Sequence, residues 1–459
     1  MNLQFFLAQS MPKLRNMMLY WVIYALWSTI GVIWVILHTL TPSTAWAWCG
    51  AMVISPPVAT LLLFLTRKRV IPQHQTTLRP SYTRLQNIIA NGCGSMLTMH
   101  NDVRSLHDAG QTYAALIRDL QRAQREINIE YYILSNDRIA KTIFDILARR
   151  SRAGVTVRII YDSIGSWQLK LHHIEALRQS GVGIRAYGSL SFPFVKPCIH
   201  RRNHRKLVVI DGNIVYLGGI NIANRYIDGG RLGHWRDEHI RIEGVVARQA
   251  QTMFLSDWVK SGGNHYQPHQ PQQHTRRTCP VQLAWAECGA TRDMLSYTIL
   301  EAIASARHTI RIATPYFLPT PEILSAICSA ARSGVKVELL IPLKADVRLI
   351  GAAAEGFVRH CVERGVNVYR YRSGFLHSKT ITIDENILIV GSANIDYRSL
   401  RYNMELSAVI YNKEVAADYI TRFYADVKNS ECVDANCYRY PSAWQLFTQG
   451  LARLLAPIL

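Results

Sequence analysis

Charged residues are scarce in this chain of 459 residues, at 18% of the total, and acidic ones are scarcest, with 32 Asp and Glu against 52 Lys and Arg. Hydrophobic residues make up 49%, which excludes a disordered polycation, because such chains lack the apolar residues for a core. A mean hydropathy close to zero excludes a polytopic transporter. The remaining class is a protein of two or three domains with a net charge of +20 and an anionic partner, either nucleic acid or phospholipid.

Cysteine and metal-ligand patterns are also missing. The nine cysteines form no CxxC pair, and no histidines accompany them at zinc-finger spacing. A small disulfide-stapled secreted module is shorter and much richer in cysteine. We therefore expect reduced thiols in a cytosol-facing protein, with no metal site and no cofactor.

One segment of the chain has no charge at all. Residues 16–66 contain no Asp, Glu, Lys or Arg, and the two apolar stretches 17–37 and 45–65 each have about the 20 residues that cross a hydrocarbon core. The Pro56-Pro57 pair is expected to kink the second stretch. Basic residues lie outside both ends of the segment, and the turn between the stretches is uncharged, so the positive-inside rule predicts a transmembrane hairpin with both ends in the cytoplasm.

The rest of the chain repeats itself. Residues 123–133 resemble 306–316, and in each case an amphipathic helix leads into a β-rich segment. Strands that alternate with helices of ten or more residues indicate βαβ units and a mostly parallel sheet. We predict a membrane anchor at 1–69, an irregular tether at 70–105, a first α/β domain at 106–264, a linker at 265–278, and a second α/β domain with an apolar C-terminal helix at 279–459.

Each copy contains the same string of reactive residues. The strings are His204, Lys206 and Asp211 followed by Gly218, Gly219 and Asn221, and His377, Lys379 and Asp384 followed by Gly391, Ser392 and Asn394. Each reads as a strand, a tight turn and a returning strand, and residues i and i+2 of a strand share a face, so the His and Lys of a copy point the same way. Asp211 and Asp384 come in the turn, where they are expected to brace the hairpin. Two strings at matched spacing in equivalent places exclude coincidence.

Two His, two Lys and two Asn that converge on one point form a site for a phosphodiester. Lysine and amide groups stabilise the non-bridging oxygens without a metal. One imidazole can attack phosphorus while the other protonates the departing alkoxide. Each histidine needs a carboxylate on its other nitrogen. Asp237 and Glu405 follow the histidines of their own copies at similar distances and are the candidates.

The paired strings resemble the HKD motifs of the phospholipase D superfamily, and the resemblance covers nearly all of the chain after residue 105. The N-terminal hairpin, the strand at 314–317 and the apolar end 444–459 are similar, more narrowly, to bacterial cardiolipin synthases. The resemblance implies two tandem phospholipase D-like α-β-α sandwich domains packed as a pseudo-dimer. It also implies the reaction of that family, which joins two phosphatidylglycerols and releases glycerol, and a location in the bacterial inner membrane with the catalytic domains in the cytoplasm.

Carried over residue by residue, the resemblance also implies roles. His204 is the nucleophile that forms a phosphatidyl-histidine, and His377 is the acid for departing glycerol and then the base for the second phosphatidylglycerol. The phosphate is held by Lys206, Lys379, Asn221, Asn394 and Ser392, and the histidines are oriented by Asp237 and Glu405. The first copy has Gly219 where the second has Ser392, so a hydroxyl contact comes from one half only. The pseudo-symmetric histidines can also exchange roles.

Several alternatives stay open at this point. The same site chemistry fits a phospholipase D that transfers the phosphatidyl group to water, or a transferase that uses another alcohol. A nucleic-acid phosphodiesterase is supported by the net charge but not by a membrane hairpin, so we expect no nucleic acid partner, and a scaffold with degenerate motifs conflicts with two intact ones. Arg201, Arg202 and Arg205 form either a cationic mouth or a solvated face. Asp162 is expected to cap a turn, and segment 444–459 either lies in the membrane interface or packs on the sheet.

Overall fold

The computed structural model describes residues 3–39, 42–66, 76–188, 201–267, 275, 277–287, 293–434 and 442–456. It divides into two compact units, and each is described by itself. One is the helical N-terminal segment, and the other, here called the head, contains all the elements described after residue 75. Most of the predicted linker, residues 268–274 and 276, lies outside the described residues.

The N-terminal segment contains three helices: α1 (Leu3–His38), α2 (Pro42–Ile54) and α3 (Pro56–Thr66). The predicted second span is interrupted at Ser55, because the two prolines that follow it have no N–H to continue the helix. The hydroxyl of Tyr24 lies 2.6 Å from the Val53 carbonyl and 2.7 Å from the Ile54 carbonyl, and thus satisfies acceptors next to this break. Within the described residues, only α1, over Arg15–His38, is long and apolar enough to cross a membrane as one helix.

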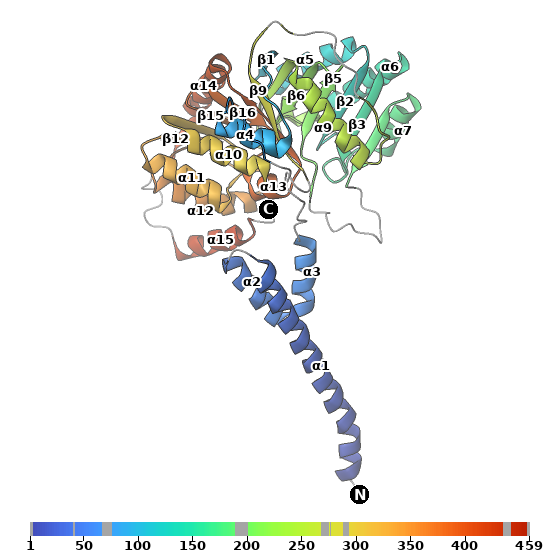
Figure 1. Cartoon of the computed structure of the whole chain (residues 1–459), viewed down its shortest axis with the longest axis vertical. Coiled ribbons are helices and arrows are strands. Elements are labelled where there is room, and N and C mark those ends of the chain that lie inside the picture. The colour runs from blue at the N-terminus through green and yellow to red at the C-terminus, as the bar shows by residue number, and fades with distance from the viewer. Residues whose placement is uncertain are drawn as a thin grey trace. The chain divides into compact units, whose positions relative to one another are not determined.

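The head contains two large sheets, one in each half (Figure 1). Read in the opposite direction, the second sheet repeats the strand order of the first, with one extra strand at its end. In the order of pairing, the first consists of β1 (Asn101–Leu106), β8 (His239–Gly244), β6 (Ile214–Gly218), β5 (Lys206–Ile210), β2 (Glu126–Tyr131), β3 (Thr156–Asp162) and β4 (Gly183–Tyr187). The second consists of β19 (Ser430–Cys432), β13 (Asn367–Tyr371), β12 (Lys336–Pro342), β10 (Thr309–Ala313), β15 (Thr380–Ile383), β16 (Ile387–Gly391), β18 (Glu405–Ile410) and β9 (Val281–Ala286). The repeat predicted from the sequence is therefore a repeat of whole sheets.

Both sheets are mixed, whereas the sequence predicted mostly parallel ones. The strands β2, β3 and β4 are parallel, as are β10, β12 and β13. All other neighbouring strands in the two large sheets are antiparallel. Each motif forms a hairpin, β5–β6 or β15–β16, whose first strand pairs antiparallel with the edge of the parallel part. Two short parallel pairs complete the strands: β7 (Trp235–Arg236) with β14 (Phe375–Leu376), and β11 (Phe317–Leu318) with β17 (Ile395–Asp396).

Helices cover both faces of each sheet, which confirms the predicted α/β class. The helices of the first half are α5 (Ala109–Arg122), α6 (Arg138–Arg152), α7 (Leu171–Gln179), α8 (Arg225–Asp228) and α9 (Val246–Lys260). Those of the second are α10 (Met294–Ser305), α11 (Pro321–Arg332), α12 (Arg348–Val362), α13 (Tyr397–Arg401), α14 (Lys413–Lys428) and α15 (Ala443–Leu454). One core lies under α5–α7 and another under α10–α12, and a third is shared by the two halves, with Leu217 and Ile240 from the first and Leu406 and Ala408 from the second.

The segment predicted as an irregular tether is largely ordered. Helix α4 (Arg84–Cys93) begins at a capping box of Thr83 and Gln86 and buries Leu85 and Ile89 in the core of the second half. Strand β1 pairs with β8 in the first sheet. The sequence misled here because its proline and glycine residues lie at the ends of these elements, where they terminate structure without preventing it.

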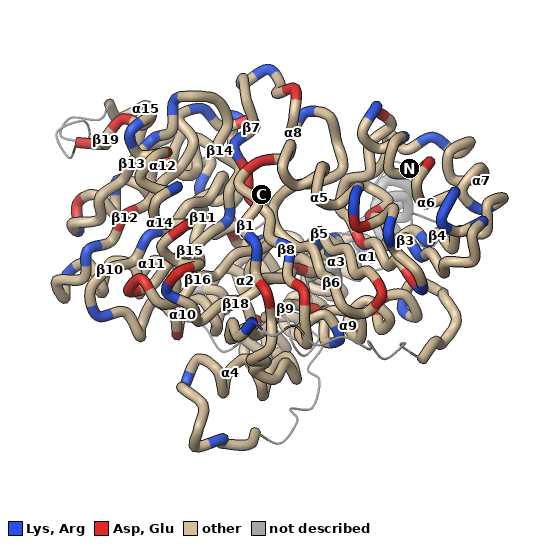
Figure 2. The backbone as a smooth tube through the Cα atoms, turned by 90° about the horizontal axis from the view of Figure 1, so that it is seen from above, with Lys and Arg blue, Asp and Glu red and all other residues tan. Residues whose placement is uncertain are grey.

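The apolar C-terminal segment forms α15, which packs against α12 within the head. Ala452 is buried there with Ala353 and Leu318, whereas Trp444 and Leu454 on the same helix are 71% and 75% exposed. The helix thus packs on the domain, which is one of the two alternatives predicted from the sequence. Its outer face stays apolar and exposed. Figure 2 shows Lys and Arg spread over both halves of the head among Asp and Glu, whereas residues 16–66 contain no Asp, Glu, Lys or Arg.

Candidate active site

The two motif hairpins occupy equivalent places in the two sheets. Lys206 at the start of β5 pairs with Tyr131 at the carboxyl end of β2, and Thr380 at the start of β15 pairs with Ala313 at the carboxyl end of β10. The histidine of each motif precedes its strand. Both histidines therefore lie at the edge of a sheet where parallel strands end and loops meet, which is the usual place of an active site in an α/β protein.

The first histidine is held by the second half of the chain. The backbone N–H of His204 donates to the Met404 carbonyl over 2.9 Å. Its Nδ1 lies 2.9 Å from Oε1 of Glu405, which is fully buried. Because a carboxylate only accepts hydrogen bonds, Nδ1 carries the hydrogen, and the lone pair is on Nε2.

The second histidine is held by the first half in the same way. The His377 N–H donates to the Arg236 carbonyl over 2.7 Å, and Nδ1 lies 2.5 Å from Oδ2 of Asp237. The two carboxylates predicted from the sequence are thus both next to histidines, but each contacts the histidine of the other copy, not that of its own. The short pair β7–β14 and the bridge between Asn203 and Met404 cross from one half to the other, and they place each acid beside the opposite histidine.

Burial makes both imidazoles neutral in the free protein. It lowers the pKa of His204, and the neighbouring lysines add to this while Glu405 opposes it. Burial and the charge of Lys379 hold the pKa of His377 well below its ordinary value. The carboxylates differ: burial raises the pKa of Asp237 to about 6, whereas for Glu405 the charge and hydrogen bond of His204 outweigh burial and lower the pKa.

The motif lysines point toward the same centre and are also buried. The ammonium of Lys206 donates to the His204 carbonyl over 2.7 Å, and that of Lys379 donates to the His377 carbonyl. Burial lowers the pKa of Lys206 to about 7 and that of Lys379 to about 8. A bound anion reverses this effect, because it stabilises the charged amine. The lysines are therefore suited to a phosphate.

The asparagines are less free than the sequence suggested. Nδ2 of Asn221 donates to the Tyr226 hydroxyl over 2.6 Å, and its Oδ1 accepts from the Ile133 N–H over 3.2 Å. Nδ2 of Asn394 donates to Asp396 over 2.9 Å, while its buried Oδ1 has no hydrogen-bond partner among the described residues. Each amide thus keeps part of its hydrogen-bonding capacity for a ligand.

The difference between Gly219 and Ser392 has a local cause. The Ser392 hydroxyl donates to Glu405 and accepts from the Leu406 N–H over 3.0 Å, so in this structure it contacts the carboxylate that holds His204. At the equivalent place in the first half, a Cβ on Gly219 would overlap the carboxylate of Asp237. The glycine is therefore required for Asp237 to reach His377.

The aspartates of the two motifs lie at the far ends of the hairpins, as expected. Asp211 and Asp384 have φ values of 51° and 46°, in the left-handed region that a turn requires. The Asp211 carboxylate accepts from the N–H groups of residues 124, 125 and 126, and that of Asp384 from those of residues 307, 308 and 309. Both fix the start of the central strand and lie away from the histidines.

Aromatic side chains line the site, and the sequence analysis missed them. The Tyr132 ring lies 4.9 Å from the His204 ring, and the Trp235 ring lies 5.1 Å from that of His377. Tyr226 and Phe375 also contact His377. Their positions offered a signal, because Tyr132 is the first residue after a buried strand and Trp235 lies two residues before Asp237.

The arginines of the first motif form neither a cationic mouth nor a solvated face. Arg205 is fully buried, pairs with Asp257, and donates to the carbonyls of Glu405 and Ala286 in the second half. Arg202 pairs with Asp162 over 2.7 Å. Asp162 also accepts from the N–H groups of residues 164 and 165, and this is the turn cap predicted for it. These charges are structural, because each is desolvated and paired.

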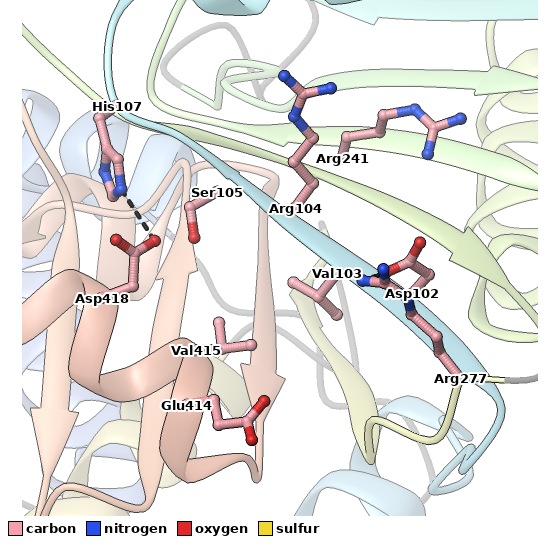
Figure 3. Close-up of a pocket in the computed structure, with 10 residues that line it drawn as sticks. All are labelled: Asp102, Val103, Arg104, Ser105, His107, Arg241, Arg277, Glu414, Val415 and Asp418. Atoms are coloured by element: carbon pink, nitrogen blue, oxygen red, sulfur yellow. Dashed lines mark hydrogen bonds and ion pairs between the residues drawn. The ribbon is translucent and has the colours of Figure 1, made fainter.

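A second link between the halves reaches the surface at His107 (Figure 3). Its Nε2 lies 2.9 Å from Oδ2 of Asp418 on α14, and its Nδ1 lies 3.3 Å from Glu238. Glu238 in turn accepts from the Ser378 hydroxyl over 2.7 Å. His107 lines an open pocket of about 580 Å³. Through Glu238, this pocket is linked to Ser378, which lies between His377 and Lys379.

The arrangement as a whole offers two neutral imidazoles and two lysines at one buried point. Across the described parts of the chain, no group of three or more His, Cys, Asp and Glu side chains is placed to hold a metal ion. One imidazole can attack phosphorus and the other can move a proton, and the lysines can stabilise the charge that develops. The site therefore fits the transfer of a phosphate diester.

Comparison with known proteins agrees with this chemistry. The family model described as "Cardiolipin synthase, PLD-like domain" matches residues 116–258 and 299–427. Cardiolipin synthase 2 of Staphylococcus epidermidis is 31% identical over 454 residues, which cover 91% of this chain and 93% of that protein. A cardiolipin synthase of Alkalihalophilus pseudofirmus is 32% identical over 374 residues, which cover 79% of this chain and 73% of that protein.

A solved structure shares the fold. The phosphatidylserine synthase of Haemophilus influenzae superposes with a TM-score of 0.62 at 14% identity, and the match covers 82% of this chain and all of that one. At this identity the likeness extends to the fold alone. The predicted pair of tandem phospholipase D-like domains is confirmed by the family model, which matches both halves of the head.

Proposed function

Because the chain belongs to the family of cardiolipin synthases with phospholipase D-like domains, and is thus a phosphatidyltransferase that makes phospholipid, we propose that it transfers a phosphatidyl group between two phosphatidylglycerol molecules. The products are cardiolipin and glycerol. The observation that carries the proposal is the pair of histidines, each held through Nδ1 by a buried carboxylate of the opposite half.

In the first step, Nε2 of His204 attacks the phosphorus of one phosphatidylglycerol. The bond between phosphorus and the glycerol oxygen breaks, and His377 gives that oxygen a proton, so that glycerol leaves and a phosphatidyl-histidine remains. His377 is neutral in the free protein, and the negative charge of the bound phosphate favours its protonation. Lys206, Lys379, Asn221 and Asn394 hold the non-bridging oxygens.

In the second step, the terminal hydroxyl of another phosphatidylglycerol attacks the same phosphorus. His377 takes the hydroxyl proton, the bond between phosphorus and His204 breaks, and cardiolipin forms. Throughout, Glu405 balances the positive charge on the substituted His204 imidazole, and Asp237 orients His377. Because the second step reverses the first with a different alcohol, the same groups serve both.

The N-terminal helices are proposed to anchor the enzyme as a membrane hairpin with the head in the cytoplasm. Residues 16–66 carry no charged side chain, and apolar side chains such as Trp21 and Ile36 are exposed. Tyr24 satisfies carbonyls at the proline break, which is a requirement for an interrupted helix in lipid. Trp27 donates to the Thr60 hydroxyl over 3.0 Å and links α1 to α3.

The test is to incubate the purified full-length protein with phosphatidylglycerol and to measure lipids and free glycerol. We expect cardiolipin and glycerol in equal amounts. Phosphatidic acid as the sole product would show a hydrolase, and a mixed phospholipid formed from an added alcohol would show a different acceptor. His204→Ala is expected to abolish the trapped phosphatidyl adduct, with His172→Ala on the exposed side of α7 as control. An adduct that survives His204→Ala but disappears in His377→Ala would reverse the two roles.

A further inference from the structure

A pocket of about 830 Å³ opens beside the first motif histidine. It is formed where β2 and β3 end, and Tyr132, Gly165, Trp167, Lys170 and Arg225 are among the residues that line it. The Tyr132 ring is at once part of this wall and, at 4.9 Å, the neighbour of the His204 ring. The pocket therefore lies next to the active site, with the Tyr132 ring between the pocket and His204.

The rim of this pocket is apolar and exposed. Trp167 and Leu171 are 76% and 74% exposed, and Ile164 is 40% exposed. A group of large apolar side chains on a water-facing loop lowers the solubility of a protein. Such a group therefore indicates a surface that binds a partner or a membrane. The three residues project from one short segment, 164–171, that follows β3.

This segment is fixed and not merely loose. Asp162 accepts from the N–H groups of residues 164 and 165 over 3.0 and 2.9 Å. The Ser166 hydroxyl donates to the Tyr132 carbonyl over 3.0 Å and accepts from the Leu134 N–H over the same distance. Residue 165 must be glycine, because a Cβ there would overlap the Tyr132 carbonyl. The exposed apolar side chains are thus held in place by hydrogen bonds to the strand that carries Tyr132.

Two cations accompany the apolar rim. Lys170 and Arg225 line the pocket, are exposed, and form no ion pair with any described carboxylate. The Arg225 guanidinium lies 5.0 Å from the centre of the Trp235 ring, which contacts His377. Lys170 and Arg225 outnumber Asp137, the one carboxylate among the described residues of the lining. That carboxylate accepts from the N–H groups of Ala140 and Asn224.

We propose that this pocket holds the acceptor phosphatidylglycerol, whose own phosphate does not react and lies near Lys170 and Arg225, with its acyl chains against Ile164 and Trp167 and the neighbouring Leu171 at the bilayer surface. The inference rests on the proposed function, since it gives the lipid of that reaction a place. An amphiphile with a negative head and two apolar chains matches a cationic wall that opens onto an apolar rim. The aliphatic side chains of Ile164 and Leu171 distinguish this surface from a platform for nucleic acid, on which successive bases stack against aromatic rings.

The second half presents a different surface, because the segment after β12 exposes Val347 and Leu349, at 44% and 40%, where the first half exposes Trp167 and Leu171. On that side α15 packs against α12, and Ala452 and Ala456 cover Leu318 at the edge where β10 and β12 end. The lipid that enters beside His204 and the lipid that enters from the second half therefore meet different walls.

Photochemical labelling tests the proposal without turnover. The full-length protein is placed in phosphatidylglycerol nanodiscs with a small share of phosphatidylglycerol that carries a diazirine on one acyl chain, and labelled peptides are mapped by mass spectrometry. We expect adducts in residues 164–171 in addition to α1–α3. Labelling confined to α1–α3 would overturn the proposal whatever reaction the enzyme catalyses.

Kinetics of rim variants provide a second test. The double variant Trp167→Glu with Leu171→Glu is expected to raise the apparent KM for bilayer phosphatidylglycerol about tenfold, since each side chain loses the free energy of apolar burial, and to lose the adducts. Tyr297→Glu, at a 52% exposed aromatic residue on α10, is the matched control. A double variant that behaves like this control would contradict the proposal. If the proposed reaction is wrong, the enzyme forms a product other than cardiolipin, while the lipid still labels residues 164–171.

Discussion

The two halves of the head repeat one sheet topology, yet they supply their histidines with different partners. His204 of the first half contacts Glu405, whose carboxylate also accepts from the Ser392 hydroxyl. His377 of the second half contacts Asp237, which has Gly219 at the place of the serine. Burial raises the pKa of Asp237 to about 6, whereas the charge and hydrogen bonds around Glu405 overcome burial and lower its pKa.

This difference gives a physical reason for unequal roles. An imidazole that bonds to phosphorus through Nε2 becomes positively charged while Nδ1 keeps its hydrogen, so it needs an ionised partner on Nδ1. Glu405 is such a partner at neutral pH. An imidazole that only passes a proton returns to its neutral form in each cycle, so it depends less on a strongly ionised partner. Burial raises the pKa of Asp237, which makes it the less strongly ionised of the two carboxylates, and this favours His204 as nucleophile and His377 as acid and base.

Replacing each carboxylate by its amide gives the largest expected difference between the halves. Glu405→Gln is expected to lower the rate about 10⁴-fold, as the loss of an ionised orienting carboxylate does in other histidine-dependent enzymes. Asp237→Asn is expected to cost about tenfold less, because burial raises the pKa of Asp237 and makes it less strongly ionised than Glu405. The measurement is single-turnover formation of the phosphatidyl adduct with each variant at pH 7.

The adduct also separates the two steps. Because glycerol departs in the step that forms the adduct, both variants are expected to slow adduct formation, Glu405→Gln the more strongly. Asp237→Asn is also expected to slow attack of the acceptor on the adduct, since His377 is the base of that step. Equal losses in both variants, or a larger loss in Asp237→Asn, would show that the partners do not distinguish the histidines. Both variants should keep the thermal stability of the parent within a few degrees, because an amide is close in shape to the acid it replaces.

Exchanging the residues that differ between the halves gives a smaller effect. Gly219→Ser is expected to reduce activity about 100-fold, since its Cβ displaces Asp237 from His377 and small misplacements are costly in catalysis. Ser392→Gly removes one hydrogen bond to an ionised group, which corresponds to a loss of about tenfold.

The pH profile of the serine variant checks the cause. The Ser392 bond lowers the pKa of Glu405, so its removal raises that pKa, and the acid limb of the kcat/KM profile should move to higher pH. In Gly219→Ser this limb should not move in that way, because Glu405 keeps its hydroxyl. If Ser392→Gly leaves the acid limb in place, the hydroxyl acts on something other than Glu405, such as the phosphate.

Much of this site could be predicted because its spacing is local. The motif His, Lys and Asp lie on one hairpin of each half, and the alternation of strand faces and the turn position follow from the sequence alone. The break at Ser55 followed from two prolines for the same reason. These features depend on a few neighbouring residues, and no knowledge of packing is needed to infer them.

The rest depends on how the halves pack. The pairing of Glu405 with His204 is set by strands that cross between copies, so sequence distance from the histidine pointed to the wrong partner. Arg205 looked like part of a surface cluster, but it is buried between Asp257 and carbonyls of the other half. Helix α4 and strand β1 were hidden because each is stabilised by a partner far away in the sequence, and local propensity does not report such partners.

The smallest expected effect concerns a contact between the halves outside the active site, His107 with Glu238 and Asp418. Burial lowers the pKa of His107, but the hydrogen bonds and charges of the two carboxylates outweigh it and raise the pKa above its ordinary value. A histidine whose pKa is higher in the folded protein than in the unfolded chain stabilises the fold fully below the unfolded pKa of about 6.5, and this contribution is lost as the pH rises through the folded pKa. His107→Gln should therefore lower the unfolding temperature by about 1–2 °C at pH 5.5 and by less at pH 9, with His172→Gln, at an exposed position of α7, as the control. An equal change at both pH values would mean that His107 joins the halves by packing and hydrogen bonding, without a contribution from its positive charge. The two halves would then differ in electrostatics only at Glu405 and Asp237.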